Sequence, residues 1–132
     1  MRPWGASVLY RPAARALEVG GDWYDLVELP GDRLGVAVGN VVGHGLSAAT
    51  VMGQLRSALS AASRSCGGPA RAPEILELYA DSVVGAENMT VASAVVDWDA
   101  HHITYSVAGH LPSALLRGDG TVEFLDRATD PL

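Results

Sequence analysis

The hydrophobic pattern of this chain changes its period twice, and this change limits the folds that the chain can adopt. Runs that are typical of strands come first, at residues 8–10, 23–29 and 34–42. Two amphipathic helical segments follow, at residues 46–66 and 73–85. From Thr90 onward the apolar residues again alternate with a period of two. Strands therefore come at both ends of the sequence and helices in the middle.

Turn signals connect these strands into hairpins. Pro30-Gly31-Asp32 separates the second and third strand-like runs, residues 97–102 form a polar loop, and Gly118-Asp119-Gly120 separates two short apolar runs near the end of the sequence. Because strands and helices do not alternate, the sequence predicts an α+β fold with a largely antiparallel sheet. We expect one domain over residues 1–132.

Composition excludes some functions. The formal charge is -6, and the nine arginines are scattered among fifteen acidic residues, so no basic face for nucleic acid is expected. No secretory signal and no apolar run of membrane-spanning length is visible. Cys66 is the only cysteine, which rules out an internal disulfide. A cytoplasmic location is expected.

Two glycine-flanked polar tips stand at the ends of apolar runs, Gly20-Gly21-Asp22 and Gly39-Asn40. Glycine lets backbone carbonyls and short carboxylates approach a hard cation closely, so the tips are candidate metal ligands. Asn40 is a neutral amide where a carboxylate is expected. We expect Asp22 and Asn40 to lie side by side, facing the start of the first long helix.

Other interpretations of these residues stay open. Asp22 could be a turn aspartate that caps its own backbone. Asp25 lies an odd number of residues from Asp22, hence on the opposite strand face, which favours a structural role. His44 lies in a Gly-His-Gly turn before a helix, where free N–H groups and the helix dipole favour a phosphate or carboxylate. A purely structural histidine is the alternative.

These residues also carry a family resemblance. The motifs are Tyr10-Arg11-Pro12-Ala13, Val19-Gly20-Gly21-Asp22-Trp23-Tyr24-Asp25, Gly39-Asn40-Val41-Val42-Gly43-His44-Gly45 with Ala48-Ala49, and Ala108-Gly109-His110 with Pro112. In order and spacing they resemble the SpoIIE/RsbU-like branch of the PPM-type metal-dependent protein serine/threonine phosphatases. The resemblance implies a sandwich of two mainly antiparallel β-sheets flanked by α-helices. It also implies two Mn²⁺ or Mg²⁺ ions that activate water to attack phosphoserine or phosphothreonine.

The resemblance gives roles to individual residues. Asp22 matches a metal-ligand aspartate, Asn40 matches the aspartate that bridges both metals, and Val41 matches the position that contributes a backbone carbonyl. His44 matches a motif histidine that would act as a general acid. His110 matches a family histidine with no role derivable from the sequence. The implied partner is a phosphorylated regulatory protein, such as a STAS-domain anti-anti-sigma factor.

Two departures from the family pattern lower the expected activity. An amide at position 40 offers one neutral oxygen and an NH₂ group that repels a cation. Residues 129–132 resemble the family segment that precedes its later strands, so we expect the C-terminal strands and their aspartates to be missing. Metal binding is therefore expected to be weak or absent, with little or no hydrolysis. A non-catalytic binding or regulatory module is the competing hypothesis. A homodimer is expected to cover the exposed sheet edges, unless the chain closes on itself.

Overall fold

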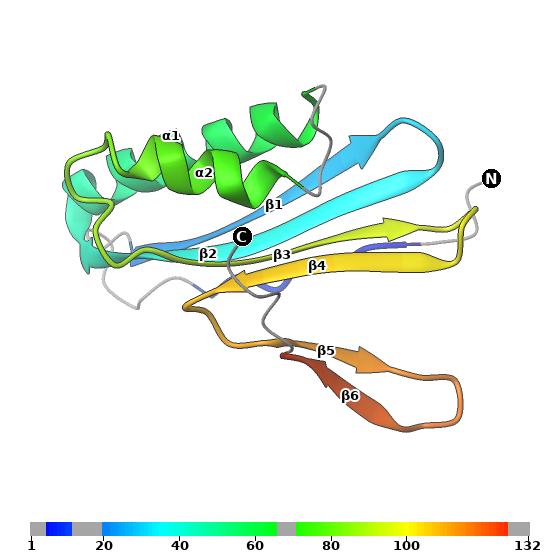
Figure 1. The fold of residues 1–132 in the computed structure, drawn as a ribbon. Coiled ribbons are helices and arrows are strands. Elements are labelled where there is room, and N and C mark those ends of the chain that lie inside the picture. Colours follow the sequence, from blue (N-terminus) through cyan, green and yellow to red (C-terminus); the bar gives the residue numbers. More distant parts are fainter. Residues whose placement is uncertain (1–4, 12–19, 66–70, 127–132) are drawn as a thin grey trace.

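The computed structural model describes residues 5–11, 20–65 and 71–126. Its elements are β1 (Gly20–Leu29), β2 (Arg33–His44), α1 (Gly45–Ser63), α2 (Ala72–Ala80), β3 (Thr90–Asp97), β4 (His102–Ala108), β5 (Ser113–Leu116) and β6 (Val122–Leu125). Both helices lie on one side of a sheet, and the β5–β6 hairpin lies on the other side (Figure 1). The α+β fold class with antiparallel sheets and flanking helices is confirmed.

The main sheet has the strand order β1-β2-β3-β4, and every neighbouring pair is antiparallel. The expected turn at residues 30–32 joins β1 to β2, and the polar loop that follows Asp97 joins β3 to β4. A second, two-stranded sheet is formed by β5 and β6 around Gly118-Asp119-Gly120. These hairpins form because their glycine, proline and aspartate residues set the backbone conformation of the turn locally.

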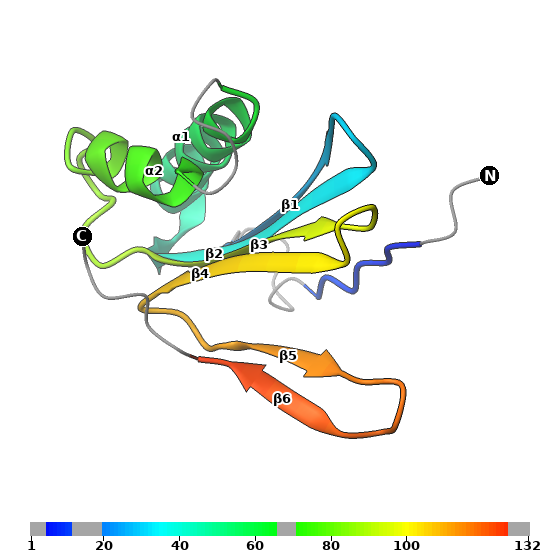
Figure 2. The same ribbon diagram turned by 45° about the vertical axis from the view of Figure 1, so that its right-hand side comes forward.

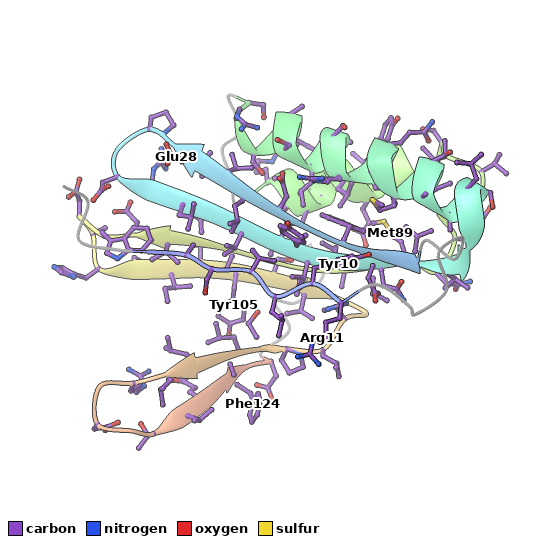
Figure 3. The ribbon with its side chains drawn as sticks, turned by 180° about the vertical axis from the view of Figure 1, so that it is seen from behind. Tyr10, Arg11, Glu28, Met89, Tyr105 and Phe124 are labelled. Carbon is purple, nitrogen blue, oxygen red and sulfur yellow. The ribbon has the colours of Figure 1, made fainter. Side chains whose placement is uncertain are left out.

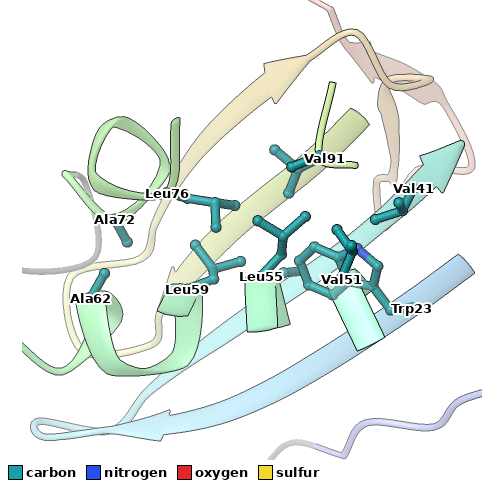
Figure 4. Packing of buried hydrophobic residues seen from close by; sticks show 11 residues of the cluster. Trp23, Val41, Val51, Leu55, Leu59, Ala62, Ala72, Leu76 and Val91 are labelled. Carbon is teal, nitrogen blue, oxygen red and sulfur yellow. The ribbon is translucent and has the colours of Figure 1, made fainter. Parts of the chain in front are cut away.

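The core lies between the main sheet and the two helices (Figure 4). Its buried members are Trp23, Ala37, Val41, Val51, Leu55, Leu59, Ala62, Ala72, Leu76, Ala86 and Val91. Trp23 faces Gly39 across the β1–β2 pair. A Cβ atom at residue 39 would lie 2.5 Å from Cε2 of the indole, so only glycine admits this ring. This contact of the Trp23 ring with Gly39, here called the interlock, helps to fix the register of β1 and β2, which carry Asp22 and Asn40.

The opposite face of the main sheet is covered in part by residues 5–11 and by the β5–β6 hairpin (Figures 2 and 3). The Tyr10 hydroxyl donates a hydrogen bond to the carbonyl oxygen of Asp22 at 3.5 Å. The rings of Tyr10 and Tyr24 lie 6.2 Å apart between centroids. Residues 5–11 therefore contact β1 on the face away from the helices.

Two predicted elements differ from the structure. Residues 8–10 form no strand, and the contacts of this segment with β1 are made through the Tyr10 side chain. The second helix ends at Ala80 rather than near Gly85. There the backbone bonds tighten to i→i−3 spacing, and the Ser82 hydroxyl donates to the Tyr79 carbonyl. Such bonds compete with helix continuation.

Some predictions fall on residues outside the described ranges. They concern the segment around Cys66, Pro12-Ala13 and Val19 of the family motifs, and residues 129–132.

Candidate functional site

Asp22 and Asn40 face each other across the β1–β2 ladder. They are direct partners in the antiparallel register, next to the Trp23–Gly39 pair. Side chains alternate along a strand and Trp23 is buried under the helices, so Asp22 and Asn40 belong to the other face. The expected side-by-side placement is therefore found. The helices cover the opposite face of the sheet, and the expected orientation of the pair toward the start of α1 stays a prediction.

Beside this pair β2 bulges. Gly20 pairs with His44 and Asp22 pairs with Asn40. Between these two pairs β1 advances by two residues and β2 by four. A bulge withdraws backbone groups from regular pairing. A Cβ placed on Gly21 would lie 1.8 Å from the Val41 carbonyl oxygen and 3.1 Å from Oδ1 of Asn40. Two oxygens thus converge on the backbone of Gly21, and only a residue without a side chain permits it.

The row of polar residues continues onto β3. Asn40 is the register partner of Thr90, so Asp22, Asn40 and Thr90 lie in line across three strands. The Thr90 hydroxyl and Nδ1 of His110 are hydrogen-bonded at 2.9 Å. The sequence motif Ala108-Gly109-His110 was the only signal for His110. Its connection to Asn40 depends on strand register, which that motif does not encode.

Asp25 lies apart from this row. It is on the helix-facing side of β1, opposite Ala37, as its odd spacing from Asp22 predicts. Its Oδ1 pairs with Nη2 of Arg56 from α1 at 3.5 Å, and its Oδ2 is buried without a hydrogen-bond partner. The Arg56 guanidinium carbon also lies 5.9 Å from the centroid of the Tyr24 ring. Asp25 therefore ties α1 to β1, a structural contact.

His44 ends β2, directly before α1 begins at Gly45. Its side chain lies outside what the structure describes, so its role as a general acid stays a prediction.

The donor set does not suit a centre for two divalent cations. It holds one carboxylate from Asp22, the amide oxygen of Asn40 and the carbonyl of Val41, hence a single negative charge. Within residues 5–11, 20–65 and 71–126 no three histidine, cysteine or acidic side chains gather into a metal-binding group. Hard divalent cations need several anionic oxygens for tight binding. In the same described part of the chain, no helix has the length and apolar character needed to cross a membrane.

Known proteins share this fold and sequence pattern. The sequence model of the family described as Stage II sporulation protein E (SpoIIE) matches residues 30–132. The crystal structure of the RsbU and RsbW domains of Rv1364c from Mycobacterium tuberculosis is 36% identical, with a TM-score of 0.78. That alignment covers 87% of this chain and 32% of the other.

A structure described as the bacterial stressosome, a modular system adapted to control secondary messenger signalling, is 21% identical with a TM-score of 0.68. It covers 87% of this chain and 56% of that one, and at this identity it supports the fold alone. The chain thus spans about a third of the Mycobacterium tuberculosis chain and just over half of the stressosome chain.

Proposed function

The chain belongs to the SpoIIE family, in the SpoIIE/RsbU-like branch of the PPM-type protein phosphatases, and we propose that residues 1–132 form one phosphatase domain acting on a phosphorylated regulatory protein. Members of this superfamily are metal-dependent. The observation that carries the proposal is the pairing of Asp22 with Asn40 beside the Val41 carbonyl. These three residues stand where the family resemblance implies metal ligands.

The proposed substrate is phosphoserine or phosphothreonine on a small regulatory protein, such as a STAS-domain anti-anti-sigma factor. The Mycobacterium tuberculosis relative carries an RsbW domain next to its RsbU domain, which supports a partner in sigma-factor regulation. Exposed apolar side chains flank the polar row, with Val42 63% and Leu111 81% exposed. They favour a protein surface over a free phosphate ester as the natural ligand.

Activity of this chain is proposed to be low. Asp22 and the Val41 carbonyl can hold a single divalent cation weakly, with Mn²⁺ or Mg²⁺ as the ion. Asn40 cannot bridge two ions, because its amide supplies one neutral oxygen and its NH₂ group repels a cation. His44 keeps its proposed role as proton donor to the leaving group. The described residues do not form a centre for two metal ions.

The donor set favours one alternative, a module that binds a phosphoprotein without hydrolysing it. Its support is the single carboxylate of the row, Asp22, next to the amide of Asn40. Cytoplasmic location and homodimer formation are also proposed. The β5–β6 hairpin carries two exposed apolar side chains, Leu116 and Phe124, that would supply surface for a dimer contact. Figure 3 shows Phe124 on this hairpin. Sedimentation of the full chain at several concentrations tests the dimer.

Asn40→Asp separates the two functions. The change restores a carboxylate with almost no change in volume, so we expect hydrolysis of a generic phosphate ester with Mn²⁺ to rise at least about tenfold, as a few kcal/mol of charge stabilisation implies. Gln54→Glu, at an exposed position of α1, adds the same charge elsewhere and should change nothing. If Asn40→Asp, made in a chain that also carries the downstream aspartates that the family resemblance implies, folds normally but stays inactive on ester and phosphoprotein alike, the binding module is the better account.

A further inference from the structure

His110 has a defined position near the proposed metal ligands but has no role among them. It follows β4 and the bridge between Val91 and Gly109, and its ring is partly buried. Its Nδ1 is hydrogen-bonded to the Thr90 hydroxyl, and Thr90 is the register partner of Asn40. The imidazole is therefore anchored at the β3 end of the polar row, on the far side of Asn40 from Asp22.

The hydrogen bond to Thr90 determines what the ring can offer a ligand. When the hydroxyl donates to Nδ1, the proton of the neutral imidazole is on Nε2. When the neutral ring instead carries its proton on Nδ1, that N–H donates to the hydroxyl and Nε2 is an acceptor. A contact between Nε2–H of the neutral ring and an anionic oxygen therefore requires the first arrangement, in which the Thr90 hydroxyl donates to Nδ1.

Asn40 adds a second donor to the same place. Its Oδ1 lies toward Gly21 of β1, which leaves the Nδ2 amino group on the other branch of the amide. Adjacent partners in antiparallel strands are about 5 Å apart, so the row from Asp22 to Thr90 spans about 10 Å. The single carboxylate is at one end and His110 at the other. The amide that weakens cation binding therefore suits direct contact with an anion.

We propose that Asn40, Thr90 and His110 form a phosphate-binding subsite, in which Asn40 Nδ2 and His110 Nε2 donate to the oxygens of a phosphate monoester. This inference rests on the proposed function for the identity of the ligand. It differs in needing no metal ion, because N–H donors of the protein itself hold the ester. Thr90 is a positioning residue, because it orients the imidazole without touching the ligand.

The subsite is tested on the full chain, stripped of metal with a chelator. Inorganic phosphate and O-phosphoserine are titrated separately while histidine ring nitrogens and backbone amides are followed by NMR. We expect saturable shifts at His110 and at the amides of Asn40 and Thr90. The exposed His101 and His102 serve as internal references and should not move. Serine without phosphate should produce no shift.

Variants make the test decisive. His110→Gln should weaken phosphate binding about tenfold, the effect of losing one charge-assisted hydrogen bond. Thr90→Val keeps the strand shape, should weaken binding about threefold, and should alter the ratio of Nδ1 to Nε2 protonation, which a merely structural role would not do. His101→Gln is the matched control. Equal shifts at all histidines, or unchanged binding in both folded variants, would overturn the proposal.

The phosphate-binding proposal and the phosphatase proposal can be refuted separately. Phosphate binding that depends on His110, in a protein that never hydrolyses a phosphoprotein, would keep this subsite and remove the phosphatase function. Hydrolysis that proceeds with unchanged KM and kcat in His110→Gln and Thr90→Val would keep the phosphatase and remove the subsite.

Discussion

Gly39→Ala should destabilise the protein, because a methyl group at residue 39 occupies the space of the Trp23 ring. The added Cβ would lie 2.5 Å from Cε2, 2.6 Å from Cζ2 and 2.7 Å from Nε1 of the indole. Carbon atoms in contact normally lie about 3.5–4.0 Å apart, so the ring must move by about 1 Å. Trp23 is 5% exposed and Leu55 is fully buried in the same cluster, so the core offers no space for that movement.

The expected loss is about 2–3 kcal/mol, at the upper end of what overpacking costs in protein cores. Urea unfolding followed by circular dichroism measures it as a lower midpoint with an unchanged slope. Gly53→Ala is the matched control, since no atom lies within 4 Å of its added Cβ. That helical position should gain about 0.5–1 kcal/mol.

A double-mutant cycle identifies the cause of the loss. In a Trp23→Leu background the ring is gone, so Gly39→Ala should cost less than in the natural chain, with a coupling energy of about 1–2 kcal/mol. The interlock would be refuted if Gly39→Ala unfolded at the same urea concentration as the natural chain. It would also be refuted if its cost were the same with tryptophan or leucine at position 23.

Two further predictions concern charges. Arg56→Met removes the ion-pair partner of Asp25, whose side chain is 12% exposed. The free energy of unfolding should fall by about 1 kcal/mol, between the values of surface and buried ion pairs. Arg71→Met is the control: its pair with Glu74 is exposed at both ends, so urea unfolding should show almost no loss of stability. Hydrogen bonds from the hydroxyl and backbone N–H of Thr121 lower the pKa of Asp119 below that of an ordinary aspartate. Its contribution to stability is therefore complete above the ordinary aspartate pKa and is lost as the pH falls through the lowered value. An NMR titration in which the Asp119 pKa did not rise in Thr121→Val would contradict this cause.

Local signals made much of the fold predictable. The turns at residues 30–32 and 118–120 were recognised because their glycine, proline and aspartate residues set the turn geometry by themselves. The end of α2 was misplaced, because Val83 continues the apolar spacing beyond the helix. Val83 can pack against the core without a helical backbone. The hydroxyl of Ser82 competes with helical N–H groups for the Tyr79 carbonyl. Residues 8–10 look like a strand from their apolar character, but no backbone ladder uses them.

The candidate site was predictable only in part. Asp22 and Asn40 were recognised because each follows a glycine at the end of an apolar run. Their adjacency depends on the hairpin register, which the turn at residues 30–32 and the contact of Trp23 with Gly39 set together. The contact between Thr90 and His110 joins residues twenty apart and depends on where the chain returns after β4. Neither hydrophobic period nor turn chemistry specifies that return.

Calorimetric titration of the full chain with Mn²⁺ tests the central claim, that Asp22 and Asn40 form a paired but charge-poor site. We expect weak binding, at most one ion, and an affinity that increases at least about tenfold in Asn40→Asp, where two carboxylates would face each other. Gln54→Glu should bind as the natural chain does. Two tightly bound Mn²⁺ ions in the natural chain would contradict the account, as would an affinity that does not depend on the residue at position 40.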